Sequence, residues 1–311
     1  MKVGILTVNG FNYGSFLQAF ALKKLVEELG HEVYIINTMA LKYTILNLLG
    51  DLSTLQVKKF FALLNAWKNL KLSSFKHFDI IIIGSDVVWN NSKPDKFFGY
   101  KLSANKIATY APCCSGTTYN DLNSLRIKSM NKIDYFSARD RETAELIKTV
   151  TNKKAINVLD PTFLIDWSKY EVPTDLNNFI LVYSYSGKNR DMAIMAKELA
   201  QRENKKLVSV INNISWCDTY ISGISPFEFL GLMKKADYVI TDTFHGTAFS
   251  LIYKKHFASF PNSHKVEYLL DSLEIPYDIL TKYNRKNVIE EKKQISKKYL
   301  SSIFKNIRSI R

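Results

Sequence analysis

The stretch Y-V-I-T-D-T-F-H-G, residues Tyr238–Gly246, decides the fold class. Its first three residues form a short apolar run that predicts a buried strand, and three polar residues then leave that strand. His245 and Gly246 open a second apolar run, Thr247–Tyr253, with helical spacing. Because backbone N–H groups at a helix start are unpaired, such a turn can hold an anion, and a histidine there adds a charge, a proton or a hydrogen bond. The alternative is a histidine that only caps the helix.

The same strand–turn–helix rhythm occurs in both halves of the chain. Lys2–Val8 predicts a strand, Ser15–Leu29 a helix capped by Ser15, and Glu32–Asn37 a second strand. Phe78–Gly84 is a continuous apolar run, as expected for a strand inside a parallel sheet. A second β/α series starts at Phe179–Tyr185. The chain is therefore predicted to be α/β, with two Rossmann-like β/α domains facing a central cleft.

The domain limits follow from a connector in which this pattern weakens. Between Asp166 and Asn178 the sequence holds Trp167, Pro173 and several polar residues. We therefore expect an N-terminal domain over residues 1–166 and a C-terminal domain over residues 167–286. Residues 287–311 predict a long basic helix, and packing of this helix back on the N-terminal domain is one arrangement that we consider.

The charge of the chain is concentrated in two segments. Of the net charge of +14, residues 281–311 contribute +8 and residues 40–78 contribute +5. Nucleic acid, an anionic membrane face and an acidic substrate would each suit this charge. We find no nucleic-acid module and expect no nucleic-acid partner. For the basic, amphipathic stretch Ala40–His77 we favour scaffold helices over a membrane-lying surface.

Several protein classes are excluded by composition. The apolar runs are far shorter than the roughly 18 residues of a membrane span, and the apolar start is too short for a signal peptide. Three cysteines, two of them adjacent at Cys113 and Cys114, do not form a disulfide framework. No Cys or His spacing matches a metal site. We expect a cytoplasmic protein without a metal.

Six segments in a fixed order resemble one family, the polysaccharide pyruvyl transferases. They extend across nearly the whole chain: Asn12–Leu22, Asp79–Asn90, Ala108–Pro112, Phe136–Asp140, Asp160–Ile165 and Thr241–Ser250. The resemblance implies a GT-B-like architecture and transfer of a pyruvyl group from phosphoenolpyruvate to a sugar, usually as a cyclic ketal on two hydroxyls. It also implies an acceptor in a cell-surface polysaccharide or its lipid-linked precursor. No cofactor is implied, and the inner face of the cytoplasmic membrane becomes a candidate location.

The chain departs from the family pattern at three places. Where members carry a Ser-Arg-Ile-like segment, this chain has Ser263-His264-Lys265-Val266, so that a point charge replaces a bidentate fork. Val87 stands where members have glutamine, which changes contacts to the acceptor. The Cys113-Cys114 pair is also unusual, and we expect both thiols to be packing residues.

The implied chemistry defines what the site must contain. The methylene carbon of phosphoenolpyruvate is protonated, a sugar hydroxyl adds to the oxocarbenium-like carbon, phosphate leaves, and a second hydroxyl closes the ketal. This requires cations for two anionic groups, an acid and a base. His245 is our first candidate, for donor binding and proton transfer. Asp86 is the candidate base or acceptor ligand, with a helix cap as the alternative.

The other candidates divide between the donor and the acceptor. Arg139 can fork a carboxylate or phosphate, unless it pairs with Asp140 or Glu142. Lys265 is the candidate second cation, with a solvated lysine as the alternative. Further candidates are the donor-turn residues Thr243 and Gly246, the hydroxyl-binding residues Asn12, Tyr13 and Gln18, and the sugar-stacking residue Trp89, for which a core position is the alternative. Asp242 is a candidate to orient His245, and Asp160 is assigned to holding a turn.

Two other functions compete with pyruvyl transfer. The first is a GT-B glycosyltransferase with a nucleotide-sugar donor, for which Glu228 is the only obvious ribose-binding acid. The second is a non-catalytic protein that binds an anionic glycan or a lipid head group on its basic face. Both alternatives stay open from the sequence alone.

Overall fold

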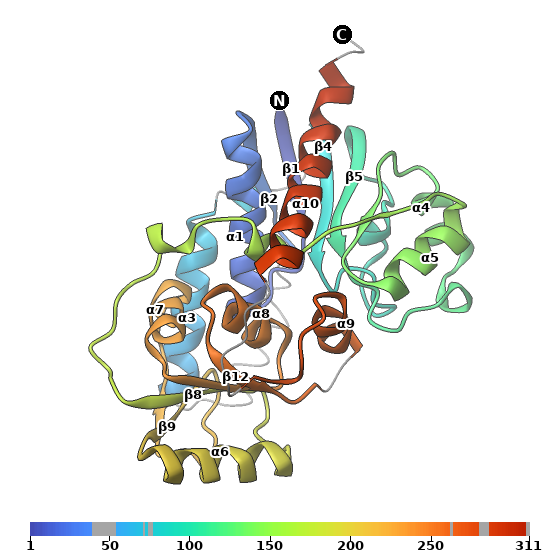
Figure 1. The fold of residues 1–311 in the computed structure, drawn as a ribbon. Helices are drawn as coiled ribbons and strands as arrows, with labels where there is room; N and C mark the ends of the chain where they lie inside the picture. The colour runs from blue at the N-terminus through green and yellow to red at the C-terminus, as the bar shows by residue number, and fades with distance from the viewer. Residues whose placement is uncertain (39–53, 71, 74–76, 262–263, 280–285, 309–311) are drawn as a thin grey trace.

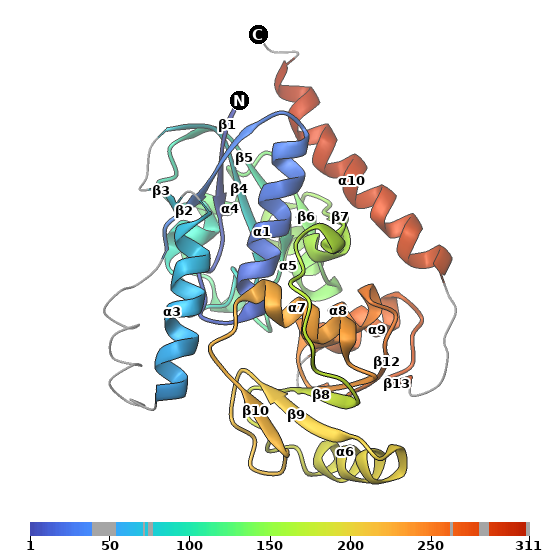
Figure 2. The same cartoon turned by 90° about the vertical axis from the view of Figure 1, so that its left-hand side faces the viewer.

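The computed structural model describes residues 1–38, 54–70, 72–73, 77–261, 264–279 and 286–308 (Figure 1). The start of the basic segment predicted as helical, residues 40–53, therefore lies outside the described residues, as do residues 309–311. Two parallel sheets organise the described chain, one in each half (Figures 1 and 2).

The first sheet has five parallel strands in the order β3-β2-β1-β4-β5. Its strands are β1 (Lys2–Leu6), β2 (Glu32–Ile36), β3 (Leu72–Ser73), β4 (Phe78–Asp86) and β5 (Ala104–Pro112). The helices α1 (Tyr13–Glu28) and α3 (Thr54–Lys68) connect its first strands. The isoleucines of β4 are completely buried, because side chains cover both faces of this central strand.

The second sheet has six strands in the order β10-β9-β8-β11-β12-β13, and only β13 is antiparallel to its neighbour. The strands are β8 (Phe179–Tyr183), β9 (Lys206–Val210), β10 (Thr219–Ile221), β11 (Tyr238–Thr241), β12 (His256–Ser259) and β13 (Asp278–Ile279). Four helices accompany them: α6 (Arg190–Glu203), α7 (Pro226–Lys235), α8 (Phe244–Ile252) and α9 (His264–Ser272). The helices α7, α8 and α9 lie on the face turned to the first half, and α6 covers the other face (Figure 2).

Short elements connect β4 to β5 and, farther along the chain, β5 to β8. They are the 3-10 helices η1 (Asp95–Phe98), η2 (Tyr119–Asp121), η3 (Pro161–Phe163) and η4 (Trp167–Lys169), the helices α4 (Ser124–Met130) and α5 (Arg141–Thr151), and the paired strands β6 (Ser137–Ala138) and β7 (Ile156–Asn157). The 3-10 turn η2 precedes α4.

The last helix, α10 (Lys286–Arg308), returns to the first half of the chain (Figure 2). The backbone N–H of Leu159 donates to Ser296 Oγ at 2.9 Å, and Tyr299 Oη donates to the carbonyl of Thr109 at 2.8 Å. Both bonds are buried. The domain limits stay a prediction, but α10 is seated against β5 and the segment before η3. No helix within the described ranges is long and apolar enough to cross a membrane.

One hydrophobic cluster extends through both halves. It joins Phe16 and Trp67 of the first half to Phe229 and Phe249 of the second. The ring of Tyr13 stacks on Phe229 with centroids 4.9 Å apart. The two sheets therefore share a core, and the face that α7 and α8 turn toward the first half is buried.

The start of α1 differs from the prediction. The helix begins at Tyr13, and Asn12 rather than Ser15 is its N-cap, with Asn12 Oδ1 accepting from the Ser15 N–H at 2.8 Å. Because Ser15 is not the helix cap, its hydroxyl donates instead to Asp86 Oδ2 at 2.8 Å. This bond connects the first turn of α1 to the end of β4.

Candidate active site

Three buried ionisable side chains from both halves meet where β11 runs into α8. Asp160 Oδ2 accepts from Arg139 Nη1 at 2.9 Å and lies 3.9 Å from His245 Nε2. The Asp160 side chain has no exposed surface, and that of Arg139 is 4% exposed. The Arg139 guanidinium also lies over the Phe244 ring, 4.2 Å from its centroid. The first half supplies the ion pair, and the second supplies the histidine.

The turn that positions His245 is built by its own threonines. Thr243 is the N-cap of α8, and its Oγ1 accepts from the Gly246 N–H at 2.9 Å. Gly246 has no room for a side chain, since a Cβ there would lie 2.0 Å from Thr241 Oγ1. The Thr243 hydroxyl thus accepts the hydrogen bond of the Gly246 N–H, and the absent side chain of Gly246 allows the tight turn. The Gly246 N–H is therefore not free to bind a donor substrate.

The imidazole of His245 is packed against the other half of the chain. A Cβ at Gly14, in the first turn of α1, would lie only 2.1 Å from His245 Nδ1. On the opposite side of the ring, Nε2 is buried and has no hydrogen-bond partner within the described chain. The ring is therefore fixed at one edge and has a free nitrogen at the other.

The charges around His245 set its protonation. Burial lowers the pKa of His245, Arg139 and Lys265 lower it further, and the carboxylates of Asp160 and Asp86 oppose them, with a net lowering. The imidazole is consequently neutral at neutral pH before any anion binds. A bound anion would favour the protonated ring, since it would add negative charge beside it.

Asp86 stands at the end of β4 with a positive φ of 78°. Its Oδ2 accepts from Ser15 Oγ and its Oδ1 from the Val87 N–H, both at 2.8 Å. Burial raises the pKa of Asp86, but the charges of His245, Arg139 and Lys265 outweigh burial and lower that pKa to about 2. The carboxylate is therefore ionised at neutral pH and is a weak base.

Arg139 has a different ion-pair partner from the two expected alternatives, Asp140 and Glu142. Its partner is Asp160, and its Nε and Nη2 have no hydrogen-bond partner in the described ranges. Asp140 instead caps α5, accepting from the Thr143 N–H at 2.8 Å. Arg139 thus keeps two N–H groups with which it can bind an anion.

Four predicted acceptor contacts have other roles in the structure. Tyr13 is buried and donates to the carbonyl of Ile224 at 3.3 Å. Gln18 is buried as well, and it bonds to the hydroxyls of Thr7 and Ser85, both at 2.9 Å. Trp89 has 0% exposure and donates from Nε1 to Phe97 O, so that its ring has no face for a sugar. Asn12 is engaged as the cap of α1.

The orienting role expected of Asp242 is also wrong. Asp242 Oδ2 accepts from Ser184 Oγ at 2.7 Å, which links the ends of β11 and β8. The carboxylate that faces His245 is that of Asp160. The sequence Asp160-Pro161-Thr162 is typical of a capped turn. It therefore gave no signal that Asp160 would also face His245.

Ser15 and Ser85 are two further polar residues at the site that the sequence analysis did not select. Ser15 donates to Asp86, and Ser85 Oγ donates to Gln18 Oε1 at 2.9 Å and approaches Asp160 Oδ2 at 3.3 Å. Both serines lie in segments that carried the family resemblance, at the carboxyl edge of the first sheet. That position is the only sequence signal by which they could have been found.

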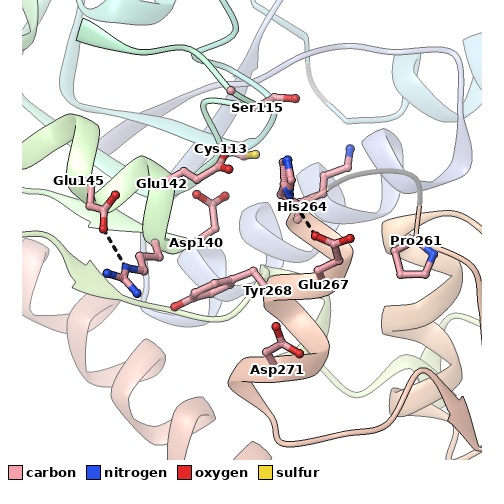
Figure 3. A pocket seen from close by; sticks show the side chains of 13 residues that line it. Cys113, Ser115, Asp140, Glu142, Glu145, Pro261, His264, Glu267, Tyr268 and Asp271 are labelled. Carbon is pink, nitrogen blue, oxygen red and sulfur yellow. Dashed lines mark hydrogen bonds and ion pairs between the residues drawn. The ribbon is translucent and has the colours of Figure 1, made fainter.

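A cleft of about 700 Å³ lies beside the buried cluster, between α5 and α9 (Figure 3). Lys265 and Tyr268 of α9 line it from the second half, and Cys113 and Asp140 line it from the first. Figure 3 shows Asp140 in the middle of the labelled residues, between Cys113 and Tyr268. Burial raises the pKa of Cys113 to about 12, so its thiol is protonated and is not a nucleophile.

The position of Lys265 connects this cleft to the charged cluster. The charge of Lys265 acts on both His245 and Asp86. From the sequence, Lys265 was a candidate only because it lies in the segment where this chain departs from the family motif. Within the described ranges, no group of three or more His, Cys, Asp or Glu side chains could hold a metal ion. The site therefore consists of an arginine, a lysine, a histidine and two carboxylates, and of these side chains Lys265 lines the cleft.

Solved structures of similar architecture are sugar-nucleotide enzymes. UDP-GlcNAc 2-epimerase of Methanocaldococcus jannaschii, in complex with UDP-GlcNAc and UDP, matches with a TM-score of 0.55 at 14% identity over 98% of this chain and 100% of that chain. The epimerase of Neisseria meningitidis bound to UDP-GlcNAc gives 0.52 at 11% identity over 100% of each chain. A putative epimerase of Listeria monocytogenes gives 0.54 at 12% identity, over 96% of this chain and 90% of that chain. These identities show the fold alone.

Two parallel β/α sheets with helices on their faces define a GT-B-like α/β protein, as predicted. No curated protein matches the chain. The family model "Polysaccharide pyruvyl transferase" matches residues 12–264, which include Arg139, Asp160 and His245. The chain belongs to the polysaccharide pyruvyl transferase family, which confirms the resemblance drawn from the six segments.

Proposed function

We propose that this protein transfers the pyruvyl group of phosphoenolpyruvate to a saccharide and closes it as a cyclic ketal on two hydroxyls. The observation that carries the proposal is the buried Nε2 of His245, which has no hydrogen-bond partner in the described chain and lies beside the Arg139–Asp160 pair. Family membership supports a pyruvyl transferase, and the charges suit a small donor with a carboxylate and a phosphate.

In this proposal the cations bind the donor and His245 moves the proton. Arg139 and Lys265 bind the two anionic groups of the donor. The negative charge of the bound donor favours protonation of the His245 imidazole. His245 then delivers its proton to the methylene carbon of phosphoenolpyruvate, which leaves an oxocarbenium-like carbon. The first sugar hydroxyl adds there and passes its proton to the phosphate, which departs and leaves a second oxocarbenium-like carbon. The second hydroxyl adds to that carbon, closes the ketal and returns its proton to His245. No cofactor enters this sequence.

Asp86 fits the role of an electrostatic stabiliser better than that of a base. A carboxylate with a pKa of about 2 accepts a proton poorly at neutral pH, but it can hold a sugar hydroxyl and offset developing positive charge. The phosphate that leaves during the reaction is a stronger base than this carboxylate. We assign hydroxyl deprotonation to the departing phosphate.

The test is a reaction with phosphoenolpyruvate and a panel of galactose-, mannose- and glucose-containing acceptors, free and lipid-linked. Phosphate release and acceptor mass are measured together, and we expect a product heavier by one pyruvyl ketal. His245→Ala should lower the rate at least 100-fold, because both the proton and a donor contact are lost. The matched control is His77→Ala, an exposed histidine outside the site whose ring nitrogens contact Ser103 Oγ at 3.1 Å and Asn105 Oδ1 at 3.0 Å. Turnover only with nucleotide sugars would overturn the proposal.

We also propose that the acceptor is presented at the inner face of the cytoplasmic membrane. Lys297 and Lys298 are exposed on α10, which supports attraction to anionic lipid. Co-sedimentation with phosphatidylserine-containing vesicles should weaken steeply between low and high salt. The variant Lys297→Glu/Lys298→Glu should bind less. Absence of binding to anionic vesicles at low salt would overturn this location.

A further inference from the structure

Asp160 makes more contacts than its turn requires. Its Oδ1 holds η3, accepting from the Thr162 N–H at 3.1 Å and from Thr162 Oγ1 at 2.8 Å. Its Oδ2 takes no part in that turn. This second oxygen instead accepts from Arg139 Nη1 at 2.9 Å and from Ser85 Oγ at 3.3 Å, and it lies 3.9 Å from His245 Nε2.

We propose that Asp160 is the positioning residue of the site, holding the Arg139 guanidinium with Oδ2 and receiving the Nε2–H of His245 when the imidazole is protonated. Part of this inference rests on the proposed function, namely that the two side chains serve donor binding and proton delivery. The contacts themselves do not depend on it. Asp160 acts through the other two residues and need not touch a substrate.

The burial of the cluster explains why a carboxylate is needed here. Arg139 and Asp160 are both removed from water, and an uncompensated charge in such a place is strongly destabilising. The separation of 3.9 Å exceeds a hydrogen bond with the neutral ring. A protonated imidazole would be attracted to Oδ2 from this distance, because its charge is opposite to that of the carboxylate. Asp160 thereby links the donor-binding cation to the proton donor across the two halves.

Four charged groups act on His245. Asp160 and Asp86 favour the imidazolium, whereas Arg139 and Lys265 disfavour it, and burial adds to the latter. Replacing Asp160 by a neutral side chain removes a favourable charge, so the pKa of His245 should fall further. A step that needs the imidazolium would then be lost at a lower pH, because the ring deprotonates earlier as the pH rises.

The central experiment is Asp160→Asn, which keeps the oxygen that caps η3 and removes the charge. The His245 ring is followed by NMR in the full-length protein without substrate, its signal assigned by its absence in His245→Gln. We expect the pKa of His245 to fall by about one unit, and the alkaline limb of kcat to shift with it. The KM for phosphoenolpyruvate should rise about tenfold, because Arg139 loses its orientation.

Asp166→Asn is the matched control. Asp166 caps η4 in the same way, accepting from the Ser168 N–H at 3.0 Å and from Ser168 Oγ at 2.7 Å, but it is outside the cluster. We expect this variant to leave the pKa of His245 and the KM unchanged. If Asp160→Asn does not fold, Arg139→Gln/Asp160→Asn removes both charges of the pair. Its comparison with Arg139→Gln, in which the Asp160 carboxylate keeps its bonds to Thr162 and Ser85, isolates the effect of the carboxylate.

The outcomes separate the two proposals. An unchanged pKa of His245 in Asp160→Asn, or an equal change in Asp166→Asn, overturns the positioning role. A fall of the pKa in a protein that shows no turnover of phosphoenolpyruvate with any acceptor supports the positioning role and overturns the proposed function.

Discussion

Gly14 is the residue of α1 that lies directly against the catalytic candidate of the other half. The site for its absent side chain is occupied by the His245 ring, with Nδ1 at 2.1 Å from an ideal Cβ. Glycine is needed here for close approach and not for its backbone freedom, because Gly14 has no positive φ. This glycine therefore determines where the imidazole can lie.

Gly14→Ala should lower the free energy of unfolding by about 1–3 kcal/mol, because a methyl group overpacks the contact with His245. Urea unfolding measures this change. In Gly14→Ala/His245→Ala the ring is absent, so the added methyl group should be nearly neutral relative to His245→Ala alone. Full additivity of the two substitutions would contradict the contact, since residues that touch are expected to couple.

The ionisation of Asp86 makes the free energy of unfolding depend on pH in the acid range. Its pKa in the folded protein is about 2 against an ordinary value of 3.8, so the ionised form contributes about 2 kcal/mol to stability. Because the folded pKa is depressed, this contribution is complete above about pH 4 and is lost as the pH falls through 2.

The measurement compares the wild type with Asp86→Asn by urea unfolding at pH 7, 5, 4 and 3. We expect Asp86→Asn to have a lower free energy of unfolding than the wild type at pH 7. This difference in free energy should narrow only below pH 4. The control is Asp79→Asn, on the same strand, whose carboxylate accepts from the Lys2 N–H at 2.8 Å and is not part of the charged cluster. A difference between wild type and Asp86→Asn that stays constant down to pH 3 would show that the carboxylate is not held ionised by its neighbours.

At the scale of elements, α10 holds the segment that leads into Asp160. Ser296→Ala leaves the buried Leu159 N–H without its partner, which should cost about 1–3 kcal/mol. Tyr299→Phe should cost less, about 1 kcal/mol, because Thr109 O still accepts from Ser137 Oγ at 3.0 Å. Chemical denaturation ranks the two variants.

Ser302→Ala is the control for these two substitutions on α10. Its hydroxyl bonds only to Tyr299 O within the same helix, at 2.7 Å, and it is partly exposed, so we expect a change below about 0.5 kcal/mol. The order Ser296, Tyr299, Ser302 is the prediction. Equal effects at Ser296 and Ser302 would mean that the Leu159 bond does not seat the helix.

Elements with strong local patterns could be predicted from the sequence. The periodicities of α1, α6 and α8 and the apolar runs of β4 and β8 are local signals, so the order of strands and helices followed from them. The two-residue strands β3, β6, β7 and β13 carry no such signal, because only tertiary packing selects them. Trp89 shows the same limit, since an aromatic residue after a strand fits a core or a sugar site equally well.

At the scale of the whole molecule, the contacts that form the site join residues far apart in the chain. Arg139 and Asp160 are 21 residues apart, and Ser85 and Asp160 are 75 apart. The sequence placed Arg139, His245 and Lys265 at sheet edges, but it could not pair them. Charge and spacing do not show which carboxylate reaches which cation, so Asp160 was assigned only its turn.

The shared core makes a further prediction for the whole molecule. Because one hydrophobic cluster includes Trp67, Trp167 and the helices of both halves, we expect the two sheets to unfold together. The four tryptophans report on different parts of the core. Trp67 and Trp167 lie in the shared cluster, Trp89 lies in a separate cluster of the first half, and Trp216 packs against a cluster of the second half. Labelling with 5-fluorotryptophan gives one fluorine signal for each of them.

All four folded signals should disappear at the same urea concentration. Phosphoenolpyruvate at 100 times its Kd should move all four midpoints together, by about 2.7 kcal/mol of added stability, because its proposed ligands come from both halves. Arg139→Gln should weaken this shift, whereas Arg202→Gln, whose exposed side chain bonds to Glu203, should not. Loss of the Trp216 signal before that of Trp89 would show that the second sheet unfolds independently, and the shared core would then not couple the two halves.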